Sequence, residues 1–292
     1  MPKVILLPVR GSAADAEVFA AAFECGQLFD AHFVGLHVRP DVQREIASFA
    51  ASEGGMMANI DTMLERMEGD ADQRERDAAL AWKQFLEQKG IAAANEPVEN
   101  GMTGEWATEV GTQADWLAVH GRTVDLIVIG RGDPEWRPDL SLMETALLET
   151  GKPVMIAPSG TPSGSRPSMG GTIAIAWKDS KEAAGAVHAA LPFLRAAGQV
   201  IIVTVTGEGD EDDHSARRLA RMLRWHNRHV TIQAVRTDGR DPAQVLLDTV
   251  QRAGAGLLVM GGYGHTRLRE AVFGGLTRAV LQAAPLPVLM TH

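Results

Sequence analysis

Short apolar runs alternate with amphipathic stretches along almost the whole chain. Runs of four to six mostly apolar residues, typical of buried parallel strands, occur at residues 4–9, 33–38, 125–130, 153–157, 172–176, 200–205, 256–260 and 287–290. Weaker strand patterns occupy residues 91–98 and 230–235, and helical patterns occupy residues 106–120, 141–150, 215–225 and 242–253. Further helices are expected to begin near residues 12, 179 and 276. Strands that alternate with helices predict mostly parallel sheets with right-handed crossovers.

Two local features refine this pattern. Ser12 with Asp15, and Asp179 with Glu182, have the spacing of helix-capping boxes. Residues 41–89 form a polar, charged insertion in which apolar side chains recur at helical spacing: Ile60, Met63, Leu64 and Met67. Glycine-containing breaks at residues 54–55 and 69–70 predict two or three helical pieces there.

The order of elements repeats after the middle of the chain. Residues 126–130 align with 257–261, and residues 144–155 align with 276–289. Residues 158–171 between the copies are rich in serine, glycine and proline, the composition of a linker. The sequence therefore predicts two copies of one five-stranded α/β unit: a domain at 1–158, a linker at 159–171 and a second domain at 172–292.

Composition excludes several classes of function. The 292 residues carry a net charge of -9, which argues against nucleic acid or an anionic membrane surface as the main partner. Cys25 is the single cysteine, so neither an intrachain disulfide nor a cysteine-based metal cluster is possible. The chain shows neither a signal-peptide pattern nor an apolar run long enough to span a membrane. A cytoplasmic protein is expected.

The pattern near the C-terminus is strand, glycine turn, long loop, glycine turn, helix. Gly261 and Gly264 precede the loop, Gly274 and Gly275 end it, and Thr277 falls in the first helical turn. Glycines allow a backbone to approach a ligand closely, and the free amides of a helix N-terminus bind anions. The alternative is a glycine-rich turn that only allows the helix to pack on its strand.

These residues resemble the nucleotide signature of the universal stress protein family. That signature is Gly, two residues, Gly, nine residues, Gly, then a small residue that is often Ser or Thr. Gly261, Gly264 and Gly274 match its spacing, Gly275 stands at the small position, and Thr277 matches a later hydroxyl. Over nearly its whole length the chain is similar to tandem universal stress proteins, which have two such domains in one polypeptide.

The resemblance implies a fold and a function. The fold would be two Rossmann-like, doubly wound five-stranded parallel sheets in the strand order 3-2-1-4-5, paired within the chain through their fifth strands. The function would be stress signalling through bound ATP or another adenine nucleotide, with or without magnesium. Whether two chains form a homodimer stays open.

The resemblance also implies which residues bind the nucleotide. In such a sheet the ligand lies where strand order reverses, between strands one and four. In the second copy the expected site contains Ala176, Trp177, Lys178, Asp179, Val205, Met260, Gly261, Gly264, His265, Gly274, Gly275, Leu276 and Thr277. Val205 would line the adenine pocket. Lys178 stands where the family usually has aspartate, and either reaches phosphate or is a solvated loop lysine. His265 either contacts phosphate or holds its loop.

The first copy departs from the signature. Its corresponding loop lacks a second glycine pair, carries the acidic residues Asp133, Glu135 and Asp139, and contains Pro134 and Pro138. Acidic side chains beside a phosphate raise its free energy, so this copy is expected to be degenerate and the chain to bind one nucleotide.

Other chemistry has little support in the sequence. His226 and His229 could be a metal pair, but no third ligand is near, so solvated or capping histidines are favoured and no metal site is expected. No nucleophile elbow, Walker lysine or zinc-protease helix is present, and no catalytic residue is assigned. Two alternatives to a nucleotide-binding stress protein remain: a slow ATPase or nucleotidyl transferase, and a partner-binding stress protein with no nucleotide.

Overall fold

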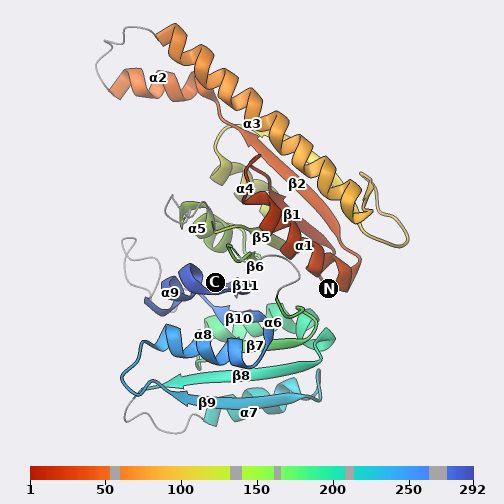
Figure 1. Ribbon diagram of the computed structural model, residues 1–292, viewed down its shortest axis with the longest axis vertical. Coiled ribbons are helices and arrows are strands. Elements are labelled where there is room, and N and C mark those ends of the chain that lie inside the picture. Colours follow the sequence, from red (N-terminus) through yellow and green to blue (C-terminus); the bar gives the residue numbers. More distant parts are fainter. Residues whose placement is uncertain (53–59, 132–139, 161–165, 208–213, 263–274) are drawn as a thin grey trace.

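The strands of both copies join in one sheet. The computed structural model describes residues 1–52, 60–131, 140–160, 166–207, 214–262 and 275–292 (Figure 1). Within these residues one 11-stranded sheet has the order β3-β4-β2-β1-β5-β6-β11-β10-β7-β8-β9. Its first half comprises β1 (Val4–Pro8), β2 (His32–Arg39), β3 (Ala92–Ala93), β4 (Thr103–Val110), β5 (Leu126–Ile129) and β6 (Val154–Ile156). Its second half comprises β7 (Thr172–Ala176), β8 (Gln199–Thr206), β9 (Val230–Arg236), β10 (Ala255–Gly261) and β11 (Val288–Thr291).

Each half is a parallel, doubly wound sheet. The first half runs β4-β2-β1-β5-β6 and the second runs β9-β8-β7-β10-β11, so both have the expected order 3-2-1-4-5. The halves meet where β6 pairs antiparallel with β11, with Met155 opposite Leu289. This confirms the expected pairing through the fifth strands. Figure 1 shows the halves at opposite ends of the long axis, with β6 and β11 between them.

Helices cover both faces of the sheet. On one face lie α1 (Asp15–Phe29), α3 (Ile60–Lys89), α6 (Lys181–Ala196) and α7 (His214–Leu223). On the other lie α4 (Gln113–Gly121), α5 (Leu140–Glu149), α8 (Pro242–Arg252) and α9 (Gly275–Ala283). Along β1, Ile5 and Leu7 pack in the core on the α1 face of the sheet, and Leu6 packs in the core on the α4 face. All three are fully buried. Burial on both faces explains why the strands read as continuous apolar runs.

The third strand of the first half was predicted in the wrong place. The sequence predicts a strand at residues 91–98 and a helix from Trp106, but β3 has only two residues and β4 contains Trp106. Trp106 packs beside Trp82 of α3, with ring centroids 6.0 Å apart, so tertiary contacts favour the strand. The helix begins later because Thr112 caps it, accepting a hydrogen bond from the Asp115 amide at 3.3 Å.

The insertion contains a shorter helix and a longer one. After α2 (Val42–Ser52), α3 runs for 30 residues straight through the predicted break at residues 69–70. A Cβ at Gly69 would meet no atom within 4 Å, so this glycine sits in an open part of the helix surface. A single exposed glycine costs a long helix only about 1 kcal/mol, which does not end it. The other predicted break, at residues 54–55, lies outside the described residues.

Neither predicted capping box forms as expected. The side chain of Asp15 accepts from amides that precede α1, and Ser12 makes no cap. Before α6 the cap is Ser180, whose hydroxyl oxygen accepts from the Ala183 amide at 3.2 Å, rather than Asp179. None of the helices in the described residues is long and apolar enough to cross a membrane.

Candidate functional site

The second half of the sheet has its topological switch point between β7 and β10. The two strands are neighbours, and Ala176 at the end of β7 is paired with Met260 near the end of β10. The chain leaves β7 through α6 toward β8, and leaves β10 through α9 toward β11, on opposite sides of the sheet. The two loops therefore diverge at the carboxyl edge, where ligands bind in folds of this kind.

Gly261 brings the loop after β10 against the start of α6. A Cβ at this position would lie 2.5 Å from the Ala183 nitrogen and 2.6 Å from the Glu182 carbonyl carbon, so no side chain fits. The Glu182 carboxyl lies at the N-terminus of α6, where a hydrogen bond from its own backbone amide lowers its pKa. Gly261, the first glycine of the predicted signature, is thus required for the close approach of its backbone to that of Glu182 and Ala183.

After β7, Trp177 is half-buried, and the next two residues are polar and open to solvent. Lys178 is exposed, and no partner for its side chain is found among the described residues. The Asp179 carboxylate accepts a hydrogen bond from the Arg218 guanidinium at 2.9 Å. The Trp177 indole N–H turns toward α7 and donates to the Ser215 hydroxyl at 2.8 Å.

Two further elements border the same edge. Strand β8 continues past Val203, the partner of Ala176, so the half-buried Val205 projects beyond β7. Helix α9 leads from β10 to the parallel strand β11, so its first turn must lie at the carboxyl edge. In that turn Leu276 is exposed and Thr277 is buried, while a Cβ at Gly275 would meet nothing within 4 Å.

Ten of the predicted site residues can thus be located on this edge or the strands that lead to it. The other three, Gly264, His265 and Gly274, lie outside the described residues. The acidic and proline residues predicted to disable the first copy, Asp133, Pro134, Glu135, Pro138 and Asp139, lie outside them as well.

The corresponding edge of the first half carries a carboxylate among backbone amides. After β1, the Asp15 carboxylate accepts hydrogen bonds from the amides of Arg10, Gly11 and Ser12, at 3.1, 2.7 and 3.1 Å. Burial raises the pKa of Asp15 in spite of these donors. A cavity beside Asp15 and Ile129 has a volume of about 20 Å³ and holds roughly one water molecule. The sequence analysis placed Asp15 in a capping box with Ser12 and did not predict that its carboxylate would bind these three amides.

Of the two histidines considered as a metal pair, His226 has a partner of another kind. The His226 Nδ1 accepts a hydrogen bond from the Arg195 Nε at 3.2 Å. Within the described ranges, no group of three or more histidine, cysteine, aspartate or glutamate side chains could hold a metal ion.

Comparison with known proteins agrees with this architecture. Residues 169–292, somewhat less than half of the chain, match the model of the universal stress protein family. No functionally curated protein has a matching sequence. Among solved structures, a universal stress protein from Archaeoglobus fulgidus DSM 4304 is 16% identical with a TM-score of 0.70, and the match covers 99% of this chain and 95% of that one.

Two structures from Pseudomonas aeruginosa resemble the whole chain as well. A protein of strain UCBPP-PA14, described as a universal stress protein, is 16% identical with a TM-score of 0.56 over 99% of this chain and 93% of that one. A protein of unknown function from strain PAO1 is 14% identical with a TM-score of 0.54 over 99% of this chain and 92% of that one. At these identities the likeness shows the fold: an α/β arrangement of universal-stress-protein type across both halves.

Proposed function

We propose that this protein binds one adenine nucleotide in its second half and uses occupancy of that site in a stress response. The observation that carries the proposal is the difference between the two crevices. The edge between β7 and β10 is bordered by the exposed residues Lys178 and Asp179 and by the start of α9. At the corresponding edge of the first half, the Asp15 carboxylate accepts from three backbone amides, and the cavity beside it holds roughly one water molecule.

The roles of the residues follow from their positions. The phosphates would lie at the start of α9, where backbone amides, Gly275 and Thr277 offer donors. The adenosine would lie over the ends of β7 and β8, beside Val205 and Trp177. Lys178, exposed after β7, supplies a positive charge on the same edge. ATP is the first candidate, and the sequence signature supports adenine nucleotides as a class.

Calorimetric titration of the full chain with ATP, with and without magnesium, tests this function. We expect one site per chain, and we expect Gly274→Val to lose binding because a side chain would occupy the approach of the phosphate. Gly69→Val is the matched control, since Gly69 lies on an open helix surface far along the chain from the crevice. Binding by Gly274→Val equal to the parent, or two equivalent sites, would contradict the proposal.

A further inference from the structure

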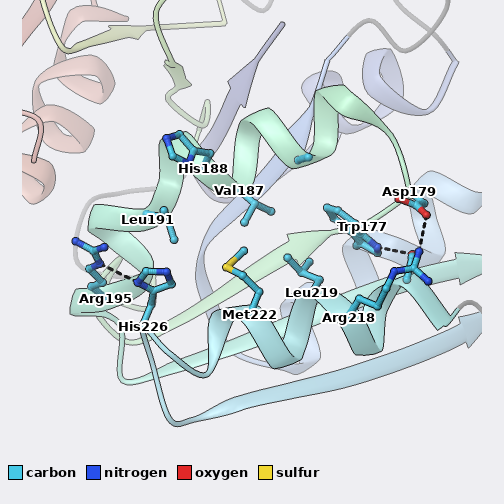
Figure 2. Close-up of a pocket in the computed structure, with 12 residues that line it drawn as sticks. Trp177, Asp179, Val187, His188, Leu191, Arg195, Arg218, Leu219, Met222 and His226 are labelled. Atoms are coloured by element: carbon cyan, nitrogen blue, oxygen red, sulfur yellow. Dashed lines mark hydrogen bonds and ion pairs between the residues drawn. The ribbon is translucent and has the colours of Figure 1, made fainter.

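A groove separates the two helices that cover the outer part of the second half. Figure 2 shows α6 and α7 on its two sides, with Arg195 and His226 at one end and Trp177, Asp179 and Arg218 at the other. Its volume is about 600 Å³, which is in the range of ligand pockets. Between the ends the walls are mostly apolar. Val187 and Leu191 of α6 lie across from Leu219 and Met222 of α7, and His188 of α6 also lines the groove.

The fold itself does not require this groove. In the first half the corresponding helices, α1 and α3, are held together by aromatic rings. Phe19 of α1 stacks on Phe85 of α3 with centroids 4.6 Å apart, and Trp82 lies 6.0 Å from Phe19. In the second half the α6 residues that line the groove are Ala184, Val187, His188, Leu191 and Arg195, none of which is a phenylalanine or tryptophan. Space between the helices is therefore a property of the second copy.

The two ends of the groove differ in charge. At one end Arg218 is compensated by Asp179, at 2.9 Å, and the Trp177 N–H is occupied by Ser215. At the other end Arg195 is bonded to a neutral partner. Because the His226 Nδ1 accepts from Arg195, the neutral imidazole carries its hydrogen on Nε2. This end thus offers the Arg195 guanidinium and the His226 Nε2–H as donors.

Within the part of the chain that the structure describes, no carboxylate lines the groove at the Arg195 end. An uncompensated cation beside apolar walls favours an anion joined to an apolar body, because the anion gains charge-assisted hydrogen bonds while the body leaves water. Along α6, Ala184 and Arg195 are eleven residues apart, about 16 Å at the rise of an α-helix. The occupant is therefore elongated.

We propose that the groove between α6 and α7 binds a fatty acid, with its carboxylate on Arg195 and His226 and its alkyl chain extending toward Trp177. This site is separate from the proposed nucleotide site and meets it only at Trp177 and Asp179. It would make the protein responsive to a second, lipophilic ligand.

Calorimetric titration with dodecanoate below its micelle concentration tests the proposal. We expect one molecule bound per chain, and no binding of dodecyltrimethylammonium, which has the same chain and the opposite charge. Arg195→Gln should weaken dodecanoate binding about tenfold or more, because it removes a charge-assisted hydrogen bond. Arg221→Gln is the matched control: it makes the same change on α7, outside the residues that line the groove, and should leave binding within about twofold.

A second variant tests the groove rather than the charge. Met222→Trp fills the space from a position 41% exposed, so dodecanoate binding should be lost while the thermal unfolding midpoint stays within a few degrees of the parent. ATP titrations of Arg195→Gln separate this proposal from the proposed function, since they should match the parent. Absence of dodecanoate binding, equal binding of the cationic analogue, or full binding by Met222→Trp would overturn the proposal.

Discussion

At the scale of single residues, one carboxylate distinguishes the two crevices. Asp15 places two oxygens among three backbone amides after β1, at the position where a bound anion would compete for the same donors. In the second half the acids near the end of β7 have other partners: Asp179 pairs with Arg218, and the Glu182 carboxyl at the start of α6 is bonded to its own backbone amide.

The raised pKa of Asp15 makes a prediction about pH. An acid whose folded pKa lies above its ordinary value of 3.8 binds its proton more tightly in the folded protein. The stability from this proton is present below pH 3.8 and is lost as pH rises through the folded pKa. In Asp15→Asn this loss should be absent. The slope of the unfolding free energy against pH should therefore differ from that of the parent by at most about 1.4 kcal/mol per pH unit.

Urea unfolding of the parent and of Asp15→Asn at several pH values between about 3.5 and 6 measures the difference. Asp179→Asn is the control, because Asp179 is exposed and its loss leaves the pH dependence from Asp15 intact. Parallel stability curves for the parent and Asp15→Asn would contradict the prediction.

Gly275 offers a test of the proposed phosphate contact. A Cβ there meets no atom within 4 Å, and the position begins α9, so Gly275→Ser should fold normally. Its hydroxyl adds one donor at the helix start, and a net hydrogen bond of about 0.5–1.5 kcal/mol should raise ATP affinity several-fold. Gly275→Ala keeps the backbone effect and lacks the hydroxyl, so calorimetry should show no gain for it. Equal ATP affinities for the serine and alanine variants would show that the added hydroxyl makes no contact with the phosphate.

At the scale of elements, the buried strands were predictable, and of the two exposed edges the strand β9 was predicted at residues 230–235 whereas β4, near the other edge, was not. Residues 126–129 and 257–260 are apolar on both faces, and the structure places them in β5 and β10. Strand β4 has mixed side chains because it lies next to the two-residue strand β3 at the sheet edge. There the positions of Trp106 and Val110 fit a helix as well as a strand, and only packing on Trp82 decides.

The candidate site was likewise predictable only in part. Glycine spacing and sheet topology located the edge between β7 and β10, because both follow from backbone geometry. The acid in the first crevice and the groove between α6 and α7 depend on where side chains far apart in sequence meet. For the groove these are stretches such as 184–195 and 215–226, whose spacing carries no signal in a single sequence.

Thr112 provides a prediction at this scale. Its hydroxyl oxygen accepts from the Asp115 amide and begins α4. Thr112→Ala should lower the free energy of unfolding by about 1 kcal/mol, because one amide of the first turn loses its partner. Thr112→Ser restores the cap and should recover most of the loss. Urea unfolding measures both, and an alanine variant as stable as the parent would show that this cap contributes nothing.

At the scale of the whole molecule, an arginine after β5 links the two halves beside the strand pairing. Arg131 is buried and donates to the backbone carbonyls of Gln282 and Ala284, at the end of α9. Burial lowers its pKa to about 10, so the guanidinium remains charged at neutral pH. A cation at a helix C-terminus interacts favourably with the carbonyl dipoles.

Arg131→Met should therefore weaken the contact between the halves. Two carbonyls lose their donor, and we expect a loss of about 1–3 kcal/mol in unfolding free energy. Arg122→Met is the matched control, since Arg122 donates to the Glu149 carbonyl at an exposed helix end within the first half. The control should change stability by less than about 0.5 kcal/mol. If Arg131→Met proves as stable as the parent, the prediction is contradicted. Packing of the methionine side chain would then compensate for the lost hydrogen bonds between the halves.

The antiparallel pairing of β6 with β11 joins two parts of one polypeptide. Separate subunits that associate through such strands come apart on dilution, because their association depends on the amount of protein present. Here the partner strand is tethered, so its effective concentration is fixed by the chain and not by the cell. A signal that needs both halves together would consequently have the same strength whether a cell makes few copies of this protein or many.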